Sequence, residues 1–269
     1  MVVIAGAKAS VGATTVAVNL AAALADSGER VVLMDAAPQQ ESNVAEVAGA
    51  ARAVEKTVAD VLSGACSAAA ALAPGPCGCL LLANRGGGKA PVDYSRHAQQ
   101  RLFAELQSLG RLASVLVVDA GSGLTPWTRR FWLRAALVAV VTTTEDLAIL
   151  DAYALVKRSV ADGIKTPIRV LANQCDSEAN AQDAYERVSS ACRRFLSREV
   201  PSLPALPRWI ADDLTHVESY PRVWEAPNSK FGHGSLWLGS AVRDVLALGE
   251  VEAVETVGSF ASLRLHNVR

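Results

Sequence analysis

Short, mainly apolar runs alternate along the chain with longer stretches in which apolar residues recur at helical spacing. The runs are Val2–Ala5, Arg30–Asp35, Leu80–Ala83, Ser114–Asp119, Ala136–Thr142 and Ile168–Ala172, and a last short one lies near Ala205–Ile210. Apolar strands separated by helices are typical of a parallel sheet with both faces covered. The pattern therefore predicts an α/β fold, a mostly parallel β-sheet flanked by helices on both faces.

The segments that follow these strands are the expected ligand-binding segments, because ligands bind at the carboxyl ends of strands in such sheets. They are Ala5–Thr15, Asp35–Asn43, Asp119–Gly123, Thr142–Glu145 and Asn173–Asp176. Each is polar, acidic or contains glycine. The first leads into an alanine-rich helix expected to end near Asp26, where Gly28 supplies a stop signal.

Length and composition favour a single folded domain. The 269 residues are 51% hydrophobic and only 5% aromatic, which disfavours an all-β fold. The net charge of −1 argues against disorder and against a dedicated nucleic-acid binder. We expect one domain over residues 1–250 and a tail over 251–269, with the proline-rich segment Pro201–Pro207 as a loop inside the domain.

The cysteines and histidines indicate neither a disulfide framework nor a metal or redox centre. The five cysteines are Cys66, Cys77, Cys79, Cys175 and Cys192, an odd number without regular spacing and without a histidine pair. We expect small buried thiols in a reducing cytoplasm and no redox cofactor. The longest wholly apolar run, Ala135 to Val141, is too short to span a bilayer, and no basic leader precedes the first strand.

The first loop has the position of a phosphate-binding loop but an incomplete set of residues. It reads A-G-A-K-A-S-V-G-A-T-T from Ala5 to Thr15, between a strand and a helix. In the general pattern G-x-x-x-x-G-K-[ST], Gly12 and Thr14 fit. Ala7 replaces the first glycine and Ala13 replaces the lysine.

The wider context of this loop resembles the MinD/ParA/FlhG family of P-loop ATPases. Lys8–Thr15 resembles that family's deviant Walker A motif K-G-G-V-G-K-T-T. V-V-L-M-D-A-A-P-Q-Q, which contains Asp35, is similar to the family's V-L-L-I-D-A-D-P-Q. V-L-V-V-D-A-G-S-G, which contains Asp119, is similar to its Walker B strand. T-T-T-E-D-L-A-I-L-D-A-Y-A-L-V-K resembles T-T-P-E-x-x-x-x-x-D-A-Y-x-x-x-K.

Four further features are most similar to the FlhG branch, which helps set the number and position of flagella. They are Asn43, Asn173, the helix through Arg194–Leu196 and A-P-N-S-K near Pro227. The resemblance implies a P-loop NTPase-like fold that binds ATP or ADP with Mg²⁺ and forms a homodimer.

The resemblance also implies roles for individual residues. The implied nucleotide-binding residues are Lys8, Gly12, Thr14, Thr15, Asn173 and Asp213, and the implied magnesium ligands are Thr14, Asp35 and Asp119. Lys8 matches the signature lysine that reaches the partner's nucleotide across the dimer. Asn173 matches the asparagine that contacts adenine. Gly121 and Gly123 match the switch that senses the terminal phosphate.

Departures from the family's motifs argue against hydrolysis. Ala13 stands where the phosphate-binding lysine belongs, and Ala37 stands where the family has the second aspartate of D-A-D. Ala9 and Ser10 replace loop glycines. Loss of the lysine is expected to weaken nucleotide binding by roughly 1.5–3 kcal/mol and to affect phosphoryl transfer more. We therefore expect a pseudo-ATPase in which Asp35 and Asp119 are vestigial. The alternative is a slow or active ATPase in which Lys8 replaces the missing lysine.

Four other segments are candidate interaction sites. Trp127–Arg134 combines two tryptophans with three arginines, so it is either a partner-binding patch or a core segment with solvated arginines. Gly86–Lys89 imitates a phosphate loop, but Pro91 follows, and we expect a surface loop. The tail has too few basic residues for stable membrane anchoring. Arg193, Arg194 and Arg198 leave nonspecific DNA binding as an alternative, although acidic neighbours favour a solvated helix face.

Overall fold

The computed structural model describes residues 1–37, 43–84, 92–209 and 226–248. Its strands are β1 (Val2–Gly6), β2 (Val31–Asp35), β3 (Ala73–Pro74), β4 (Leu80–Leu82), β5 (Val115–Ser122), β6 (Leu137–Thr142) and β7 (Ile168–Ala172). Its α-helices are α1 (Ala13–Asp26), α2 (Val44–Val47), α3 (Val58–Ser63), α4 (Arg96–Ser108), α5 (Arg129–Trp132), α6 (Asp146–Ala161), α7 (Glu178–Leu196) and α9 (Lys230–Leu248). Short 3₁₀ helices lie at Ala69–Ala71, Pro76–Gly78 and Leu109–Arg111.

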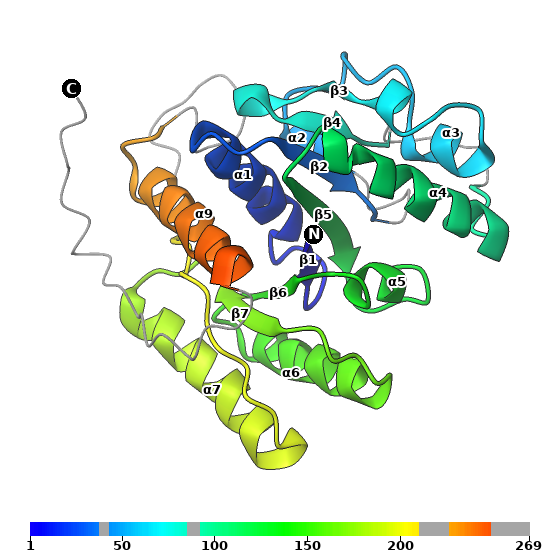
Figure 1. Ribbon diagram of the computed structural model, residues 1–269. Coiled ribbons are helices and arrows are strands. Elements are labelled where there is room, and N and C mark those ends of the chain that lie inside the picture. Colours follow the sequence, from blue (N-terminus) through cyan, green and yellow to red (C-terminus); the bar gives the residue numbers. More distant parts are fainter. Residues whose placement is uncertain (38–42, 85–91, 210–225, 249–269) are drawn as a thin grey trace.

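The strands form one sheet in the order β3-β4-β2-β5-β1-β6-β7 (Figure 1). All neighbouring strands are parallel except β3, which is antiparallel to β4 at the edge. The chain passes from β1 to β2 and back to β5, so the strand order reverses beside β1. In open α/β sheets, ligands bind at such a reversal, outside the carboxyl ends of the strands.

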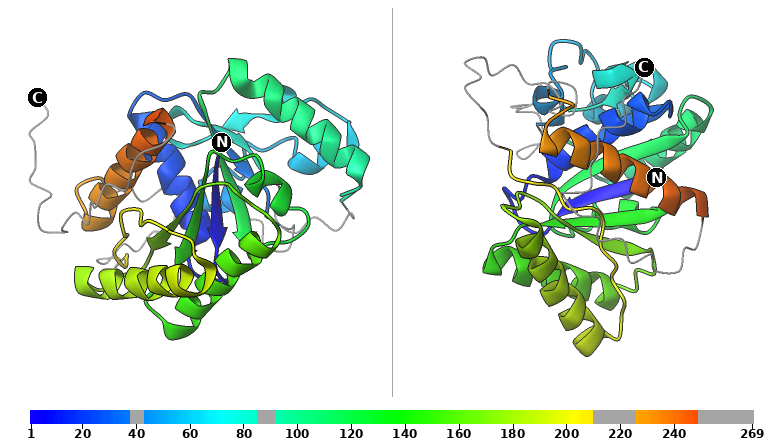
Figure 2. Two further views of the ribbon diagram at one scale, coloured as in Figure 1. Left: turned by 60° about the horizontal axis from the view of Figure 1, so that its bottom comes forward. Right: turned by 90° about the vertical axis from the view of Figure 1, so that its left-hand side faces the viewer.

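Helices cover both faces of the sheet, as the sequence predicts (Figure 2). Side chains alternate along β1, so Val2 and Ile4 face α1, α2 and α9, while Val3 and Ala5 face the layer that contains α3–α7. All five residues of β1 are buried. Both core clusters are predominantly aliphatic, and together they hold the carboxyl edge of the sheet as a rigid base for the loops.

Six of the seven predicted strands are present, each within about three residues of its expected bounds. The strand expected near Ala205–Ile210 is absent from its described part, residues 205–209, which form only the isolated parallel bridge Cys175–Pro207. A second isolated bridge, Val170–Ser202, joins the preceding residues to β7. Proline lacks the N–H group that a β-ladder needs, and this segment contains three prolines between 201 and 207. The prediction of a loop over Pro201–Pro207 is consistent with this course.

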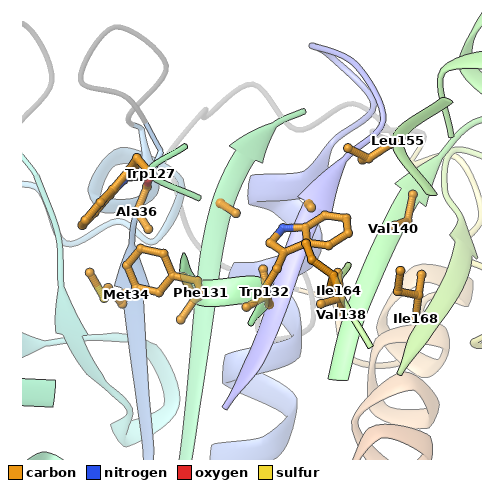
Figure 3. Packing of buried hydrophobic residues seen from close by; sticks show 14 of the residues in the cluster. Met34, Ala36, Trp127, Phe131, Trp132, Val138, Val140, Leu155, Ile164 and Ile168 are labelled. Carbon is orange, nitrogen blue, oxygen red and sulfur yellow. Dashed lines mark hydrogen bonds between the residues drawn. The ribbon is translucent and has the colours of Figure 1, made fainter. Parts of the chain in front are cut away.

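The tryptophans of Trp127–Arg134 belong to the core (Figure 3). Trp132 and Phe131 have no exposed surface and Trp127 is 8% exposed. The Trp127 Nε1 donates a hydrogen bond to the Ala36 carbonyl oxygen at 2.8 Å. The expectation of an aromatic partner-binding patch here is therefore wrong, because these rings pack against the sheet, while Leu133 and Arg134 stay exposed.

Among the described residues, no helix has the length and apolar character needed to cross a membrane. Asp213, the Gly86–Lys89 loop and the 251–269 tail, which carry expectations from the sequence, lie outside the described residues.

Candidate functional site

The loop between β1 and α1 has the backbone shape of a phosphate-binding loop. Gly12 caps α1 in the left-handed conformation, with φ of 82°, and its carbonyl oxygen accepts the hydrogen bond from the Val16 amide at 2.9 Å. Ser10 also has a positive φ, of 66°. Glycine adopts this conformation without steric cost, whereas a residue with a β-carbon does not. The loop therefore keeps the glycine-type geometry at a position where the sequence has serine.

A cleft of about 320 Å³ lies over this loop. Its lining comes from the loop and α1 (Lys8–Thr15), from α2 (Asn43 and Val47) and from the end of β5 (Gly121 and Ser122). Backbone N–H groups at a helix N-terminus attract anions such as phosphate. Ala13 is the first residue of α1 and lines the cleft, so its methyl group occupies the position that a lysine side chain would extend from.

Asp35 and Asp119 lie side by side at the carboxyl ends of β2 and β5. They are register partners in the parallel ladder, and neither has exposed surface. Each Oδ1 accepts a hydrogen bond from the backbone amide two residues further on, from Ala37 at 3.1 Å and from Gly121 at 3.0 Å. These bonds hold both carboxylates against the backbone that follows their strands.

Gly121 and Gly123 connect the end of β5 to the first loop. Both have positive φ, of 65° and 75°. The Gly123 amide donates a hydrogen bond to the Gly6 carbonyl oxygen at 3.0 Å. The segment expected to sense a terminal phosphate therefore adjoins the cleft and is tied to the end of β1.

The Lys8 ammonium forms an ion pair with Glu145, which immediately precedes α6. The Nζ of Lys8 lies 3.0 Å from Oε2 of Glu145, with 33% of the lysine and 69% of the glutamate side chain exposed. A pair this exposed stabilises the fold by about 0–1 kcal/mol, so little free energy opposes its opening. In this structure Lys8 is paired with a carboxylate of its own chain.

Asn173 and Gln174, which follow β7, hold the loop from the other side. The Asn173 Nδ2 donates to the Val11 carbonyl oxygen at 2.8 Å, and the Gln174 Nε2 donates to the Ser10 carbonyl oxygen at 3.2 Å. Asn173 is 3% exposed, and its Oδ1 has no hydrogen-bond partner among the described residues. A β-carbon on Gly12 would lie 2.5 Å from the Asn173 Nδ2, so this contact also requires glycine at position 12.

The sequence-predicted site residues thus gather at one edge of the sheet. Lys8, Gly12, Thr14 and Thr15 line the cleft, and Asp35 and Asp119 lie at neighbouring strand ends. Asn173 is next to the loop, and its amide nitrogen bonds to the loop backbone.

Several of the residues present suit a magnesium nucleotide. The loop amides suit phosphate oxygens, and the Thr14 hydroxyl and the two aspartates are oxygen ligands of the kind Mg²⁺ prefers. Within the described part of the chain, no group of three or more histidine, cysteine or acidic side chains is placed to hold a metal ion. The missing element is a cation at position 13.

Sequence reasoning missed the contacts of Glu145 and Gln174. The contact between Lys8 and Glu145 could have been predicted, because Lys8 follows β1, Glu145 follows β6, and these two strands are neighbours. The contact of Gln174 had no sequence signal, because its hydrogen-bond acceptor is a backbone carbonyl oxygen 164 residues away. Carbonyl groups occur at every residue and leave no trace in a sequence.

The arginines considered for DNA binding do not form one patch. Arg198 donates hydrogen bonds to the carbonyl oxygens of Ile164 and Thr166 at 2.9 and 2.6 Å, and burial lowers its pKa. It is a structural residue that joins the end of α7 to the loop before β7. Arg193 and Arg194 are exposed on α7.

Comparison with known families gives one match across most of the domain. The model of the CobQ/CobB/MinD/ParA nucleotide binding domain matches residues 2–217. The chain is similar to the antiactivator FleN of Pseudomonas aeruginosa, with 32% identity over 207 residues that cover 77% of this chain and 73% of FleN. It is also similar to the flagellum site-determining protein YlxH of Helicobacter pylori, with 24% identity over 73% of this chain and 65% of YlxH.

Solved structures agree on the fold. MinD in the MinC:MinD cell division complex of Aquifex aeolicus superposes with a TM-score of 0.72 at 19% identity, covering 96% of this chain and 99% of that one. MinD of Pyrococcus horikoshii, solved with Mg-ADP, superposes with a TM-score of 0.70 at 22% identity, covering 93% and 97%. At these identities the likeness concerns the fold.

Proposed function

Since the chain belongs to the CobQ/CobB/MinD/ParA nucleotide-binding family, we propose that it is a hydrolysis-deficient member that regulates cellular positioning through protein contacts. Membership confirms the family resemblance found in the sequence. FleN and YlxH are named for flagellar roles, and MinD for cell division. The 32% identity with FleN over most of both chains favours a flagellar process in the cytoplasm over division or partition.

The observation that carries the proposal is the position of Ala13. It is the first residue of α1, 9% exposed, and it lines the cleft directly beside the left-handed Gly12. A lysine side chain extended from this position would enter the cleft, where its ammonium would neutralise phosphate charge. Phosphoryl transfer depends almost wholly on positioned charge, so an alanine here removes one of the charges that would stabilise the transition state.

Ala37 supports the same conclusion. It is 1% exposed, and its amide is bonded to Asp35. A carboxylate at this position would be the group to orient an attacking water. Asp35 and Asp119 are both retained, so the chain keeps its magnesium ligands while it lacks the groups for bond cleavage. We infer that Mg-ATP and Mg-ADP bind weakly and that their phosphates serve to order the loop.

Protein contacts are supported by apolar side chains beside the cleft. Leu147 and Leu150 on α6 are 66% and 59% exposed, and they follow closely after Glu145, the partner of Lys8. Large apolar side chains at such exposure are favoured where a partner covers them. A partner or a second copy bound here would adjoin the Lys8–Glu145 pair.

The proposal is tested by hydrolysis of radiolabelled Mg-ATP by the full chain, compared with an Asp119→Asn variant that removes a magnesium ligand. We expect the two rates to be equal within error. A wild-type rate clearly above that of Asp119→Asn would overturn the proposal. Circular dichroism of both proteins confirms that the variant is folded.

A slow ATPase that dimerises on nucleotide is the second candidate, and the exposed Lys8–Glu145 pair favours it. Because this pair is weak, Lys8 is available to a phosphate group of its own or a partner's nucleotide. This candidate requires sedimentation to show a dimer with Mg-ATP that disappears in Lys8→Ala. The same oligomer with and without Mg-ATP would exclude it.

A further inference from the structure

A second cavity lies at the opposite edge of the sheet from the nucleotide cleft, where the strands begin. Its volume is about 470 Å³, and we refer to it as the amino-edge cavity. It is lined by Met1, Val32, Phe103, Leu106, Gln107, Leu109, Gly110, Ala113, Ser114, Leu116 and Arg134. Most of this lining is apolar, from the end of α4 and the starts of β2 and β5.

The rim of this cavity is apolar and basic. Leu112 and Leu133, next in sequence to lining residues, are 46% and 43% exposed. Arg134 lies over the Phe103 ring, with its guanidinium carbon 4.4 Å from the ring centroid.

Arg30 and Arg111 also adjoin the cavity. The Arg30 guanidinium donates a hydrogen bond to the Arg111 carbonyl oxygen at 3.1 Å. One carboxylate, Glu29, is also present at the rim and accepts a hydrogen bond from the Ser114 hydroxyl at 2.7 Å. Among the described residues, none of these three arginines forms an ion pair with a carboxylate. The cavity therefore suits an apolar segment that carries several negative charges.

The last described helix ends at this edge. Close contacts of Gly234 with Leu206 and of Gly239 with Ala23 show that α9 runs from the carboxyl edge toward the end of α1. In Figures 1 and 2 the end of α9 and the N-terminus lie side by side at the same end of the molecule. Met1 itself lines the cavity. The chain after Leu248 thus begins at the same edge of the sheet as this cavity, although α9 packs on the face opposite α4.

The sequence after Leu248 has the complementary character. It reads G-E-V-E-A-V-E-T-V-G-S-F from 249 to 260, with Glu250, Glu252 and Glu255 between apolar residues. Its apolar residues recur every third position: Val251, Val254, Val257 and Phe260. Twelve residues span up to about 40 Å when extended and about 18 Å when helical, so an extended segment is long enough to pass around the edge of the sheet.

We propose that residues 250–260 dock into the amino-edge cavity of the same chain, with their apolar side chains against Phe103 and Leu106 and their carboxylates toward Arg134. Burial of apolar surface supplies the stabilisation, and the arginines select the acidic segment. This site lies at the edge opposite the nucleotide cleft. The proposal therefore stands or fails independently of ATP binding and hydrolysis.

Hydrogen exchange tests the docking in the full chain. We compare the wild type with a Glu250→Lys, Glu252→Lys, Glu255→Lys triple variant, whose substitutions lie outside every described element. We expect backbone amides of residues 103–113 to exchange at least about fivefold more slowly in the wild type. Equal exchange in the two proteins overturns the proposal. Slowing that depends on protein concentration also overturns it, because the occupant is then a second copy.

Binding of a synthetic peptide gives a second measurement. A fluorescent peptide of residues 249–262 is titrated into the triple variant, whose own tail is expected to leave the cavity. We expect saturable binding that weakens about threefold to tenfold in Arg134→Glu and is unchanged in Arg193→Glu, an exposed arginine on α7. Gly110→Phe should block binding by filling the cavity, since a β-carbon there meets no described atom within 4 Å. Absence of binding, or equal binding in Gly110→Phe, contradicts the proposal.

Discussion

Asn173, after β7, donates a hydrogen bond from Nδ2 to the carbonyl oxygen of Val11, in the loop after β1, at 2.8 Å. The two residues are 162 positions apart in sequence. The bond joins the strand next to β6 to the phosphate-binding loop, and the whole contact is buried. Side chains that follow β7 thus hold the backbone of the loop after β1.

Removal of this bond should destabilise the fold. Asn173→Ala leaves the buried Val11 carbonyl oxygen without this donor, which is expected to lower the free energy of unfolding by about 1–3 kcal/mol. Gln174→Ala is the matched control, because its bond to Ser10 is longer and exposed, and its loss should cost less than about 1 kcal/mol. Urea unfolding measures both. Equal losses in the two variants would show that the Asn173 bond has no special role.

Ser10→Gly should stabilise the loop. Ser10 has a φ of 66°, a conformation that is expected to cost a residue with a β-carbon about 1–2 kcal/mol. Glycine avoids this cost but increases the entropy of the unfolded chain, so we expect a net gain of about 0.5–1 kcal/mol. Ser10→Ala keeps the β-carbon and should show no gain. Urea unfolding midpoints are measured for the three proteins. A Ser10→Gly variant that is less stable than the wild type would contradict the claim that the backbone at Ser10 is strained.

Lys8→Ala and Glu145→Gln should change stability little. The pair is exposed, so each variant is expected to lose less than about 1 kcal/mol. Any larger effect on nucleotide-dependent assembly must then arise from contacts that Lys8 makes outside its own chain. Parallel measurements of thermal unfolding and of sedimentation with Mg-ATP separate the two roles. A loss of several kcal/mol in Lys8→Ala would instead assign Lys8 to the fold.

Stability should fall at alkaline pH because of buried thiols. Desolvation by burial raises the pKa of both Cys79 and Cys175 to about 12 from a reference of 9.0. Between these values the unfolded chain releases a proton that the native protein keeps. Each thiol therefore contributes stability that is fully present below pH 9. Above pH 9 this contribution falls by about 1.4 kcal/mol per pH unit, until the pKa of the thiol in the folded protein is reached.

Urea midpoints at pH 8 and pH 10 measure this effect. We expect a larger decrease in the wild type than in a Cys79→Ala, Cys175→Ala variant, with Cys66→Ala as the control because Cys66 is only partly buried. Equal decreases in all three proteins would assign the alkaline loss to other groups.

Most of the fold could be predicted because its signals are local. The strands around Asp35 and Asp119 are short apolar runs, and Gly28 marks the end of the first helix. The sequence left open whether Trp127 is buried, because Trp127 precedes the short helix α5 and helical spacing does not place it on a face. The two-residue strand β3, which contains Pro74, had no local sequence signal.

The site could be predicted only in part. Motif positions place Lys8, Gly12 and Thr14 at the loop, and strand ends place the two aspartates beside it. The roles of Asn173 and Glu145 depend on contacts between distant segments. Such contacts follow from the strand order, in which β1 lies between β5 and β6, and the strand order is not encoded in any single segment.

Calorimetric titration of Mg-ATP into the wild type and into Ala13→Lys tests the central claim most directly. A lysine at the start of α1 adds a charge-assisted contact to phosphate, so we expect the variant to bind about 10- to 100-fold more tightly than the wild type. Equal affinity in the two proteins would mean that another group already binds the phosphates, and it would contradict the account.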